Sequence, residues 1–412
     1  MFNNIKEAIF WIENIKRKEK RTDLSRITKV LNDHNNPQEN FTKVHVAGTN
    51  GKGSTCHILK TCLQNKYKVG VFTSPYVTVF NERIKINDEY ISDNDLLRYI
   101  NSSYNYFINY EKENGDIIPF FELIFLISLL YFKDNKVDIA IIEVGVGGVL
   151  DCTNCFNYEV SAISNIGFDH IDYLGPTIED IAMHKFGILK ENNTLYTTIS
   201  EDLYKLLKKF CMKKNITKNL INTKDISNIK LDINQTSFTY NGFDFKTTLL
   251  GIHQVYNTVL AISILNDYFK FSYFEINKFI SNVSFNGRFE ILSEKPLIII
   301  DGAHNVDGIN SLVQTVKLLF NKKVNFCFAA MKDKDIENMV NKIEDVSKSI
   351  SFTQINYYRT NDVNNFKSNL SNISYYDKID NLIDNVKKLD DEEIVIFTGS
   401  LYFISEIRKY FK

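Results

Sequence analysis

At 412 residues the chain is longer than one hydrophobic core usually supports, so the sequence predicts two domains. Hydrophobic residues make up 44% and charged residues 24%, which is the balance of a folded globular protein. With 49 Lys and Arg against 50 Asp and Glu, the net charge is -1, and no global field attracts nucleic acid or anionic lipid. An anionic ligand must therefore be held by a local site.

The beginning of the chain and its longest apolar run argue against secretion and membrane insertion. Residues 1–20 place apolar side chains at helical spacing between charges, which predicts an amphipathic helix instead of a signal peptide. The apolar run 117–132 is interrupted by Pro119 and Glu122 and is too short to span a bilayer. Six scattered cysteines lack the regular spacing of a disulfide framework. We therefore expect a cytoplasmic protein with neither a membrane nor a nucleic-acid partner.

Strand-like and helix-like segments alternate along the chain in two series. Residues 43–47, 137–144 and 160–166 are short, apolar and rich in β-branched side chains, typical of strands buried on both faces of a parallel sheet. A second series begins after Pro296 and ends with residues 393–397. The predicted fold class is α/β, with a doubly wound N-terminal domain and a smaller, Rossmann-like α/β domain.

A polar connection separates the two series. It carries Gly287 and Pro296, and we place the boundary near Glu294, which predicts domains 1–294 and 295–412. Residues 217–245 read as short polar strands with a hairpin turn at Asn241-Gly242. We expect these strands to form a small antiparallel addition to the first domain.

The strongest local signal is HVAGTNGKGST, residues 45–55, in which an apolar strand runs through a glycine-rich turn into a helix. Such a turn directs backbone N–H groups at phosphate oxygens, the helix adds its positive N-terminus, and Lys52 adds a charge. A tight turn of small residues is the alternative, but it requires no lysine followed by hydroxyl groups. The sequence predicts that the phosphates are bound by Gly48, Thr49, Asn50, Gly51, Lys52, Gly53, Ser54 and Thr55.

The spacing of this loop differs from the general P-loop pattern, which has four residues between its glycines and a hydroxyl directly after Lys. GTNGKGST resembles the form found in the Mur ligase superfamily, particularly in the folylpolyglutamate synthase and dihydrofolate synthase family. Further blocks follow in the order of that family. They are NPQ (36–38), TSP (73–75), ERIKIN (82–87), EVGVGGVLDCTN (143–154), DHIDYLGPTIEDIA (169–182), HQVYN (253–257), DGAHN (301–305) and GSLY (399–402).

Two polar residues follow neighbouring predicted strands of the first domain. Glu143 ends one strand and His170 follows the next, so both face the edge at which ligands of α/β sheets gather. Taken alone, they could be an ion-pair carboxylate and a loop histidine. The resemblance implies that both bind Mg²⁺, and a hydroxyl of the loop, from Ser54 or Thr55, can be a further ligand. It also implies that Lys185 carries a carbamate for a second Mg²⁺, with an unmodified lysine as the alternative.

The resemblance assigns further contacts on the second half of the chain. It implies that Asn257 reaches the adenine, Arg288 the phosphates and Asp301 the ribose, while His304 approaches the phosphate or the incoming glutamate. A buried amide and a surface salt bridge are the alternatives for Asn257 and Arg288. The residues implied in catalysis are Lys52, Lys185, Arg288 and His304, and they would meet only if the domains close on each other.

Some positions depart from the family pattern. Val149 stands where Arg is common, Tyr76 where His is common, His184 where Glu precedes the lysine and Asn286 where Pro precedes GR. Tyr76 and Glu122 are candidates for substrate contact, although Glu122 could equally be a buried capping carboxylate.

The resemblance implies an ATP-dependent ligase that adds L-glutamate to a folate or to dihydropteroate through an acyl phosphate. ATP, Mg²⁺ and the Lys185 carbamate are the implied cofactors, and a monomer is the implied assembly. Two alternatives are a Mur-type ligase acting on a peptidoglycan precursor and a nucleotide-binding regulator without catalysis. The pair Cys152 and Cys155 is better read as incidental than as a zinc or redox site, because no second pair has matching spacing.

Overall fold

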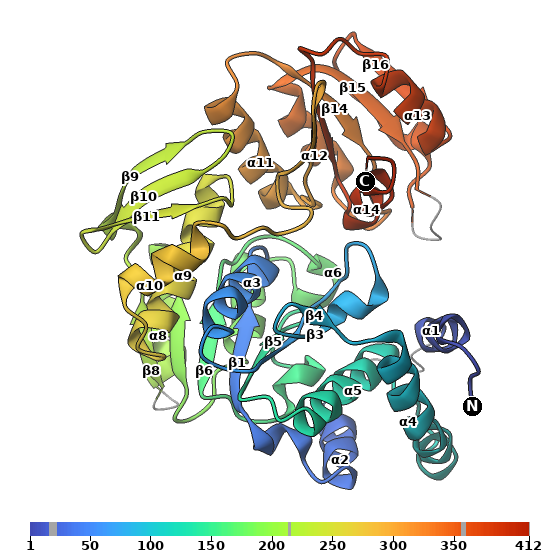
Figure 1. Ribbon diagram of the computed structural model, residues 1–412, viewed down its shortest axis with the longest axis vertical. Helices are drawn as coiled ribbons and strands as arrows, with labels where there is room; N and C mark the ends of the chain where they lie inside the picture. The colour runs from blue at the N-terminus through green and yellow to red at the C-terminus, as the bar shows by residue number, and fades with distance from the viewer. Residues whose placement is uncertain (16–22, 213–215, 356–359, 412) are drawn as a thin grey trace. The chain divides into compact units, whose positions relative to one another are not determined.

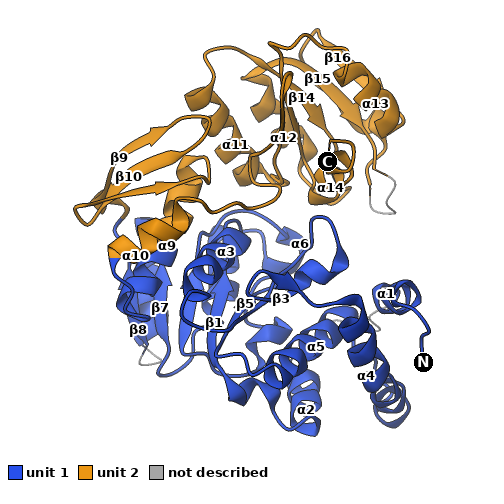
Figure 2. Ribbon diagram, viewed as in Figure 1, with its two compact units in different colours: residues 1–222, 260–272 blue, residues 223–259, 273–412 orange. Residues whose placement is uncertain are grey.

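The computed structural model describes residues 1–15, 23–212, 216–355 and 360–411, which form two compact units (Figure 2). Unit 1 takes its residues from 1–222 and 260–272, and unit 2 from 223–259 and 273–412. The boundary between the units runs through helix α9 (Ile252–Asp267). The amphipathic helix expected at the start is α1 (Ile5–Glu13), whereas residues 16–20 of that expectation lie outside the described residues.

Unit 1 is built on an eight-stranded sheet with the order β4-β3-β2-β5-β1-β6-β7-β8 (Figure 1). Its strands are β1 (Thr42–Ala47), β2 (Val69–Phe72), β3 (Ile84–Ile86), β4 (Glu89–Tyr90), β5 (Ile139–Glu143), β6 (Val160–Ile163), β7 (Thr194–Thr197) and β8 (Thr217–Leu220). Its helices, besides α1 and the end of α9, are α2 (Ser25–Asp33), α3 (Lys52–Leu63), α4 (Asp93–Asn114), α5 (Phe120–Asp134), α6 (Ile171–Leu174), α7 (Ile178–Phe186) and α8 (Glu201–Met212). The strands from β2 to β8 in this order pair in parallel, and β3 and β4 extend the sheet antiparallel.

Helices cover both faces of this sheet, which explains why its central strands are buried along almost their whole length. One buried cluster joins the sheet to α4 and α5, and another joins it to α7 and α8. Every residue of β5 is buried, as expected for a strand enclosed on both sides. The predicted doubly wound α/β fold is therefore confirmed, and the three predicted strands correspond to β1, β5 and β6.

Unit 2 contains two sheets. The smaller is antiparallel, with the order β11-β10-β9, and the larger has the order β12-β13-β17-β14-β15-β16. The strands are β9 (Ile226–Leu231), β10 (Thr236–Tyr240), β11 (Phe243–Thr247), β12 (Glu290–Glu294), β13 (Leu297–Ile300), β14 (Val324–Phe328), β15 (Ser347–Thr353), β16 (Ile373–Tyr376) and β17 (Ile394–Thr398). The helices, besides the start of α9, are α10 (Tyr273–Ile280), α11 (Val306–Leu319), α12 (Ile336–Glu344), α13 (Ile379–Val386) and α14 (Leu401–Arg408).

The hairpin predicted at Asn241-Gly242 joins β10 to β11, and both turn residues have positive φ, 51° and 77°. The segment 217–245 is not one antiparallel addition, however. Its first strand, β8, pairs in parallel with β7 at the edge of the large sheet, and only β9, β10 and β11 are antiparallel. Edge strands carry a weak hydrophobic pattern, so the polar sequence of β8 did not separate the two cases.

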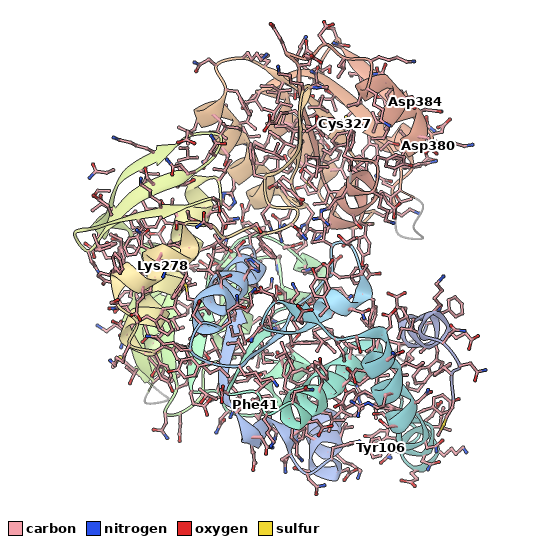
Figure 3. The ribbon with its side chains drawn as sticks, in the orientation of Figure 1. Phe41, Tyr106, Lys278, Cys327, Asp380 and Asp384 are labelled. Atoms are coloured by element: carbon pink, nitrogen blue, oxygen red, sulfur yellow. The ribbon has the colours of Figure 1, made fainter. Side chains whose placement is uncertain are left out.

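The six-stranded sheet encloses the main core of unit 2, with β14 and β17 buried along their whole length. Cys327 lies in β14 and is buried (Figure 3). All six cysteines are free thiols. Within the described residues, no helix is long and apolar enough to cross a membrane.

Candidate active site

The glycine-rich loop of unit 1 joins the end of β1 to the start of α3. Gly48 has a φ of +151° and Gly51 of +83°, values that favour glycine. A Cβ at Gly48 would lie 2.0 Å from Ser164 Oγ, so no side chain fits there. Among the described residues, no side chain caps the first turn of α3, whose N–H groups are therefore available to an anion.

Residues that follow β6 hold this loop in place. Thr49 Oγ1 lies 2.9 Å from Gly167 O and 3.0 Å from Gly167 N, and Asn50 N donates to Asn165 Oδ1 at 2.6 Å. Ser164 Oγ donates to Asn50 O at 2.5 Å. The sequence analysis missed these supports. Their position directly after the strand that neighbours β1 was the available signal, because carboxyl ends of parallel strands meet at one edge.

Lys52 and the hydroxyl residues of α3 lie at the same place. Lys52 Nζ donates to Gly48 O at 3.0 Å and to Thr49 O at 3.1 Å, so the ammonium lies over the loop. Thr55 Oγ1 donates to Gly51 O at 3.0 Å, which engages this hydroxyl within the helix. Ser54 is buried in the same turn, at 2% exposure, and is the better candidate for a metal-binding hydroxyl.

Glu143 ends β5 and is paired in register with Val46 of β1, just before the loop. Its carboxylate is 5% exposed, and its Oε2 accepts a hydrogen bond from Ser74 N at 3.1 Å. Burial raises the pKa of the Cys56 thiol, the Glu143 carboxylate raises it further, and the Lys52 ammonium lowers it. The opposite charges of Glu143 and Lys52 therefore both act on one position of α3.

Lys185 is buried in α7, at 3% exposure. Burial lowers the pKa of this lysine to about 7, the positive charge of Lys52 lowers it as well, and Asp169 opposes the shift. In a substantial fraction of the molecules, this side chain is therefore a neutral amine at neutral pH. The same electrostatic effects place Lys185, Lys52 and Asp169 in one neighbourhood.

His170 begins α6 with a φ of +52°. Its Nε2 lies 3.9 Å from Asp169 Oδ2, and its side chain is 35% exposed. Unit 1 thus brings the predicted residues Lys52, Glu143, Lys185 and His170 to the carboxyl edge of its sheet. It adds Asp169, which the sequence analysis had quoted only as part of a block.

The donors at this edge fit Mg²⁺ that arrives with a triphosphate. No group of three or more His, Cys, Asp or Glu side chains forms a ready metal cluster in the described part of the chain. Mg²⁺ usually keeps several waters and takes only one or two carboxylates from the protein besides substrate phosphates. The buried Glu143 carboxylate and the Ser54 hydroxyl are oxygen donors of this kind, whereas the His170 imidazole is a nitrogen donor that Mg²⁺ favours less.

The two substrate candidates have other partners in the structure. Glu122 is 1% exposed, and both of its oxygens accept hydrogen bonds from Arg26, from Nε and from Nη2, at 2.8 Å each. This two-point ion pair joins α5 to α2. Tyr76 Oη donates to Glu13 Oε1 at 3.3 Å, and its ring lies 5.1 Å from the Arg83 guanidinium.

In unit 2, Asp301 follows β13 and is 8% exposed. Its Oδ2 accepts from Phe289 N and its Oδ1 from Ala303 N, at 2.9 Å each. Burial raises the pKa of this carboxyl, and the charge of Arg288 opposes the shift. Arg288 Nη1 lies only 2.5 Å from where a Cβ on Gly302 would be, so the guanidinium packs against this glycine.

His304 Nδ1 donates to Gly302 O at 2.8 Å, which puts His304 beside Arg288 and Asp301. Asn257 is buried and its Nδ2 donates to Gln254 Oε1 at 3.1 Å, so its amide is engaged within α9. The sequence analysis missed His253. Burial lowers the pKa of that imidazole to about 4, and the charge of Arg288 lowers it too.

Comparison with known proteins relates both units to one family. The Mur ligase middle domain matches residues 120–265, and the Mur ligase glutamate ligase domain matches residues 287–401. A dihydrofolate synthase/folylpolyglutamate synthase of Bacillus subtilis is 32% identical over 430 aligned positions, which cover 100% of both chains.

Solved structures agree with this relationship. A folylpolyglutamate synthase (FPGS) of Thermotoga maritima has a TM-score of 0.84 and 30% identity, covering 99% of this chain and 96% of its own. An FPGS in complex with AMPPCP and folate has a TM-score of 0.85 and 28% identity, covering 99% of each chain. The chain therefore belongs to the dihydrofolate synthase/folylpolyglutamate synthase family of ATP-dependent ligases, with Mur ligase middle and C-terminal domains.

Proposed function

We propose that this chain joins L-glutamate to the carboxylate of a folate or of dihydropteroate at the expense of ATP. The observation that carries the proposal is the phosphate loop of unit 1, with Lys52 over it and the buried Glu143 beside it. This arrangement occurs in a chain that is matched over its whole length by a dihydrofolate synthase/folylpolyglutamate synthase.

The reaction needs activation because a carboxylate has a poor leaving group. The acceptor carboxylate attacks the γ-phosphorus of MgATP, which yields ADP and an acyl phosphate. The amine of glutamate then attacks the acyl carbon, and phosphate leaves. The N–H groups at the start of α3 and the Lys52 ammonium bind the phosphate oxygens and offset their charge during transfer, which is the main catalytic task of a protein in phosphoryl transfer.

Ser54 and Glu143 are the residues we propose to hold the Mg²⁺ that accompanies ATP, with His170 nearby. This ion supplies charge neutralisation at the phosphate oxygens. We propose a carbamate on Lys185 as an oxygen ligand for a second Mg²⁺. Its burial supports this assignment, because a pKa of about 7 leaves a neutral amine, the form that reacts with CO₂.

The residues of unit 2 receive roles from the family resemblance. We propose Arg288 for a nucleotide phosphate, Asp301 for the ribose, and His304 for the phosphate or the incoming glutamate. The Nδ1–H of His304 is used by Gly302 O, so its Nε2 is the nitrogen that can accept a proton or a hydrogen bond. Asn257 remains our candidate for the adenine and Tyr76 for the acceptor, whereas the ion pair of the buried Glu122 with Arg26 favours a structural role for that carboxylate.

Phosphate release with ATP, Mg²⁺, bicarbonate and L-glutamate tests the function, with dihydropteroate and tetrahydrofolate supplied as separate acceptors. We expect release that depends on the acceptor, and mass spectrometry should find the acceptor extended by one glutamate. If neither dihydropteroate nor tetrahydrofolate stimulates phosphate release, the proposal is refuted. The comparison of the two acceptors also decides which of the two activities the chain has.

Three further properties stay predictions. We expect a monomer, a cytoplasmic location and a domain boundary near residue 294. Analytical ultracentrifugation of the full chain tests the first of these.

A further inference from the structure

A buried chain of hydrogen bonds lies at the base of the phosphate-loop strand in unit 1. His45 in β1 and Thr153 are fully buried, and Asp151 is 6% exposed. His45 Nε2 lies 2.8 Å from Thr153 Oγ1, and Thr153 Oγ1 lies 2.6 Å from Asp151 Oδ1. None of these residues has a role in the mechanism above.

The direction of these hydrogen bonds follows from the number of protons. A carboxylate only accepts, so Thr153 uses its single hydroxyl proton toward Asp151 and must accept from His45 Nε2–H. The other ring nitrogen, Nδ1, is buried and meets no hydrogen-bond partner among the described residues. A second proton, on Nδ1, would make the ring a buried cation with an N–H that has no acceptor among the described residues, which is costly. The ring is therefore neutral, and burial and the charge of Lys190 lower the pKa of His45 accordingly.

The imidazole is also fixed in orientation. Its ring stacks on Tyr158 with centroids 4.0 Å apart and an interplanar angle of 10°. Tyr158 Oη donates to Thr153 O at 2.6 Å, so the same tyrosine holds both His45 and Thr153. The geometry leaves His45 few alternatives to its bond with Thr153.

The other end of this chain reaches the segment that follows Glu143. Asp151 Oδ2 accepts from Val146 N at 3.0 Å. The same segment contacts the backbone of α7, because Val149 N donates to His184 O at 2.9 Å. A Cβ on Gly148 would lie 3.2 Å from Lys185 Cα. Residues 145–150 are thus packed between Glu143 and the helix turn that carries Lys185.

We propose that His45, Thr153 and Asp151 form a positioning relay that fixes residues 145–150 against the phosphate-loop strand, and so sets the placement of Glu143 and Lys185 for Mg²⁺. The inference deepens the proposed function and rests on its assignment of Glu143 and Lys185 to metal binding. Partners of this kind, which act through a ligand, typically change metal affinity 10- to 100-fold when they are removed.

The matched pair Thr153→Val and Thr153→Ser tests the relay. Valine keeps the size of the side chain and removes the hydroxyl, whereas serine keeps the hydroxyl. We measure binding of ADP to the full chain by calorimetry with and without Mg²⁺. Thr153→Val should reduce the gain in ADP affinity that Mg²⁺ causes by about 10- to 100-fold and leave ADP binding without Mg²⁺ unchanged. Thr153→Ser should behave like the wild type. Equal Mg²⁺ dependence in Thr153→Val and the wild type would overturn the relay.

A second measurement needs no substitution and covers the case in which Thr153→Val does not fold. Nitrogen NMR of the wild-type chain labelled at histidine should find His45 as the neutral tautomer with its proton on Nε2. A proton on Nδ1, or on both nitrogens, would contradict the relay. Neither measurement requires turnover. If the chain releases no phosphate with either acceptor, the proposed function is refuted, but calorimetry and NMR still test the relay.

Discussion

The two units place polar residues at the same kind of sheet edge but arrange them in opposite ways. In unit 1 the end of β1 leads into a loop whose lysine lies over it and whose helix N–H groups are uncapped within the described residues. In unit 2 the end of β13 leads to Asp301, whose carboxylate accepts the N–H groups of Phe289 and Ala303. One edge offers donors to a ligand, whereas the other uses its donors internally.

The difference shows that two sheet edges of the same kind can present different chemistry, because the residues after each strand decide which donors and acceptors stay open to a ligand. Open N–H groups and a cation suit a phosphate. A buried carboxylate, with its charge partly balanced by Arg288, suits a hydroxyl donor such as that of a ribose. Four predictions test this contrast, from the largest expected effect to the smallest.

Replacing Lys52 should have the largest effect. Lys52→Met removes the charge over the loop and should lower kcat by about 100- to 1,000-fold, or about 3–4 kcal/mol, the cost of losing one charge-stabilising donor. Steady-state phosphate release measures it. Lys208→Ala, an exposed lysine of α8, is the control and should leave kcat unchanged. If Lys52→Met has the same kcat as the control variant, Lys52 does not stabilise the transferred phosphate, and the proposed difference between the two edges is wrong.

The buried imidazole of unit 2 should make stability depend on pH. In the unfolded chain His253 takes up a proton near pH 6.5, but in the folded chain only near pH 4, so the free energy of unfolding falls as the pH falls between these values. At 1.36 kcal/mol per pH unit, the loss attributable to His253 approaches about 3 kcal/mol. Urea unfolding of His253→Gln should therefore lose less stability than the wild type over this range. His34→Gln is the control and should follow the wild type. If the free energy of unfolding of His253→Gln depends on pH as that of the wild type does, His253 is not held neutral.

Lys185→Ala should separate a carbamate from a plain lysine. Loss of a metal-site ligand should lower activity about 10- to 100-fold, by analogy with losses of metal-site partners. Added formate or acetate should restore part of it, because a small carboxylate can occupy the place of the carbamate. Lys205→Ala, an exposed position of α8, controls for the added salt. Activity indifferent to Lys185→Ala would remove the carbamate from the mechanism.

Asp301→Asn should have the smallest effect. The amide keeps one acceptor oxygen, so one of the two backbone N–H groups loses its partner, at a cost of about 1–2 kcal/mol in the free energy of unfolding. The charge facing Arg288 is lost as well. Chemical denaturation measures the cost, and ADP binding shows whether the carboxylate also serves the nucleotide. Unchanged stability would mean that the two N–H groups find another acceptor.

Much of this molecule could be read from the chain. The apolar runs at β1, β5, β6 and β13 predicted two α/β units because strands enclosed by helices need apolar residues on both faces. The block around Lys52 predicted the phosphate loop because only a few residue types combine backbone freedom with a positive charge. The parallel pairing of β8 was missed, since a polar edge strand carries no signal for its direction.

The placement of Glu122 shows where sequence reasoning ends. From the sequence, the Glu122 carboxylate could contact the substrate or pair within the core. Only the fold brings Arg26 from α2 against both Glu122 oxygens. In the same way, Ser164 and Asn165 support the phosphate loop from a distant part of the chain.

The sequence by itself indicated the family, the order of the elements and the glycine-rich loop that we propose for phosphate, because these depend on local geometry and on residue type. Only the tertiary structure decided which side chains are neutral and which partners hold them. Burial and charges contributed by other segments lower the pKa of Lys185 and of His45, and such surroundings exist only once the chain has folded.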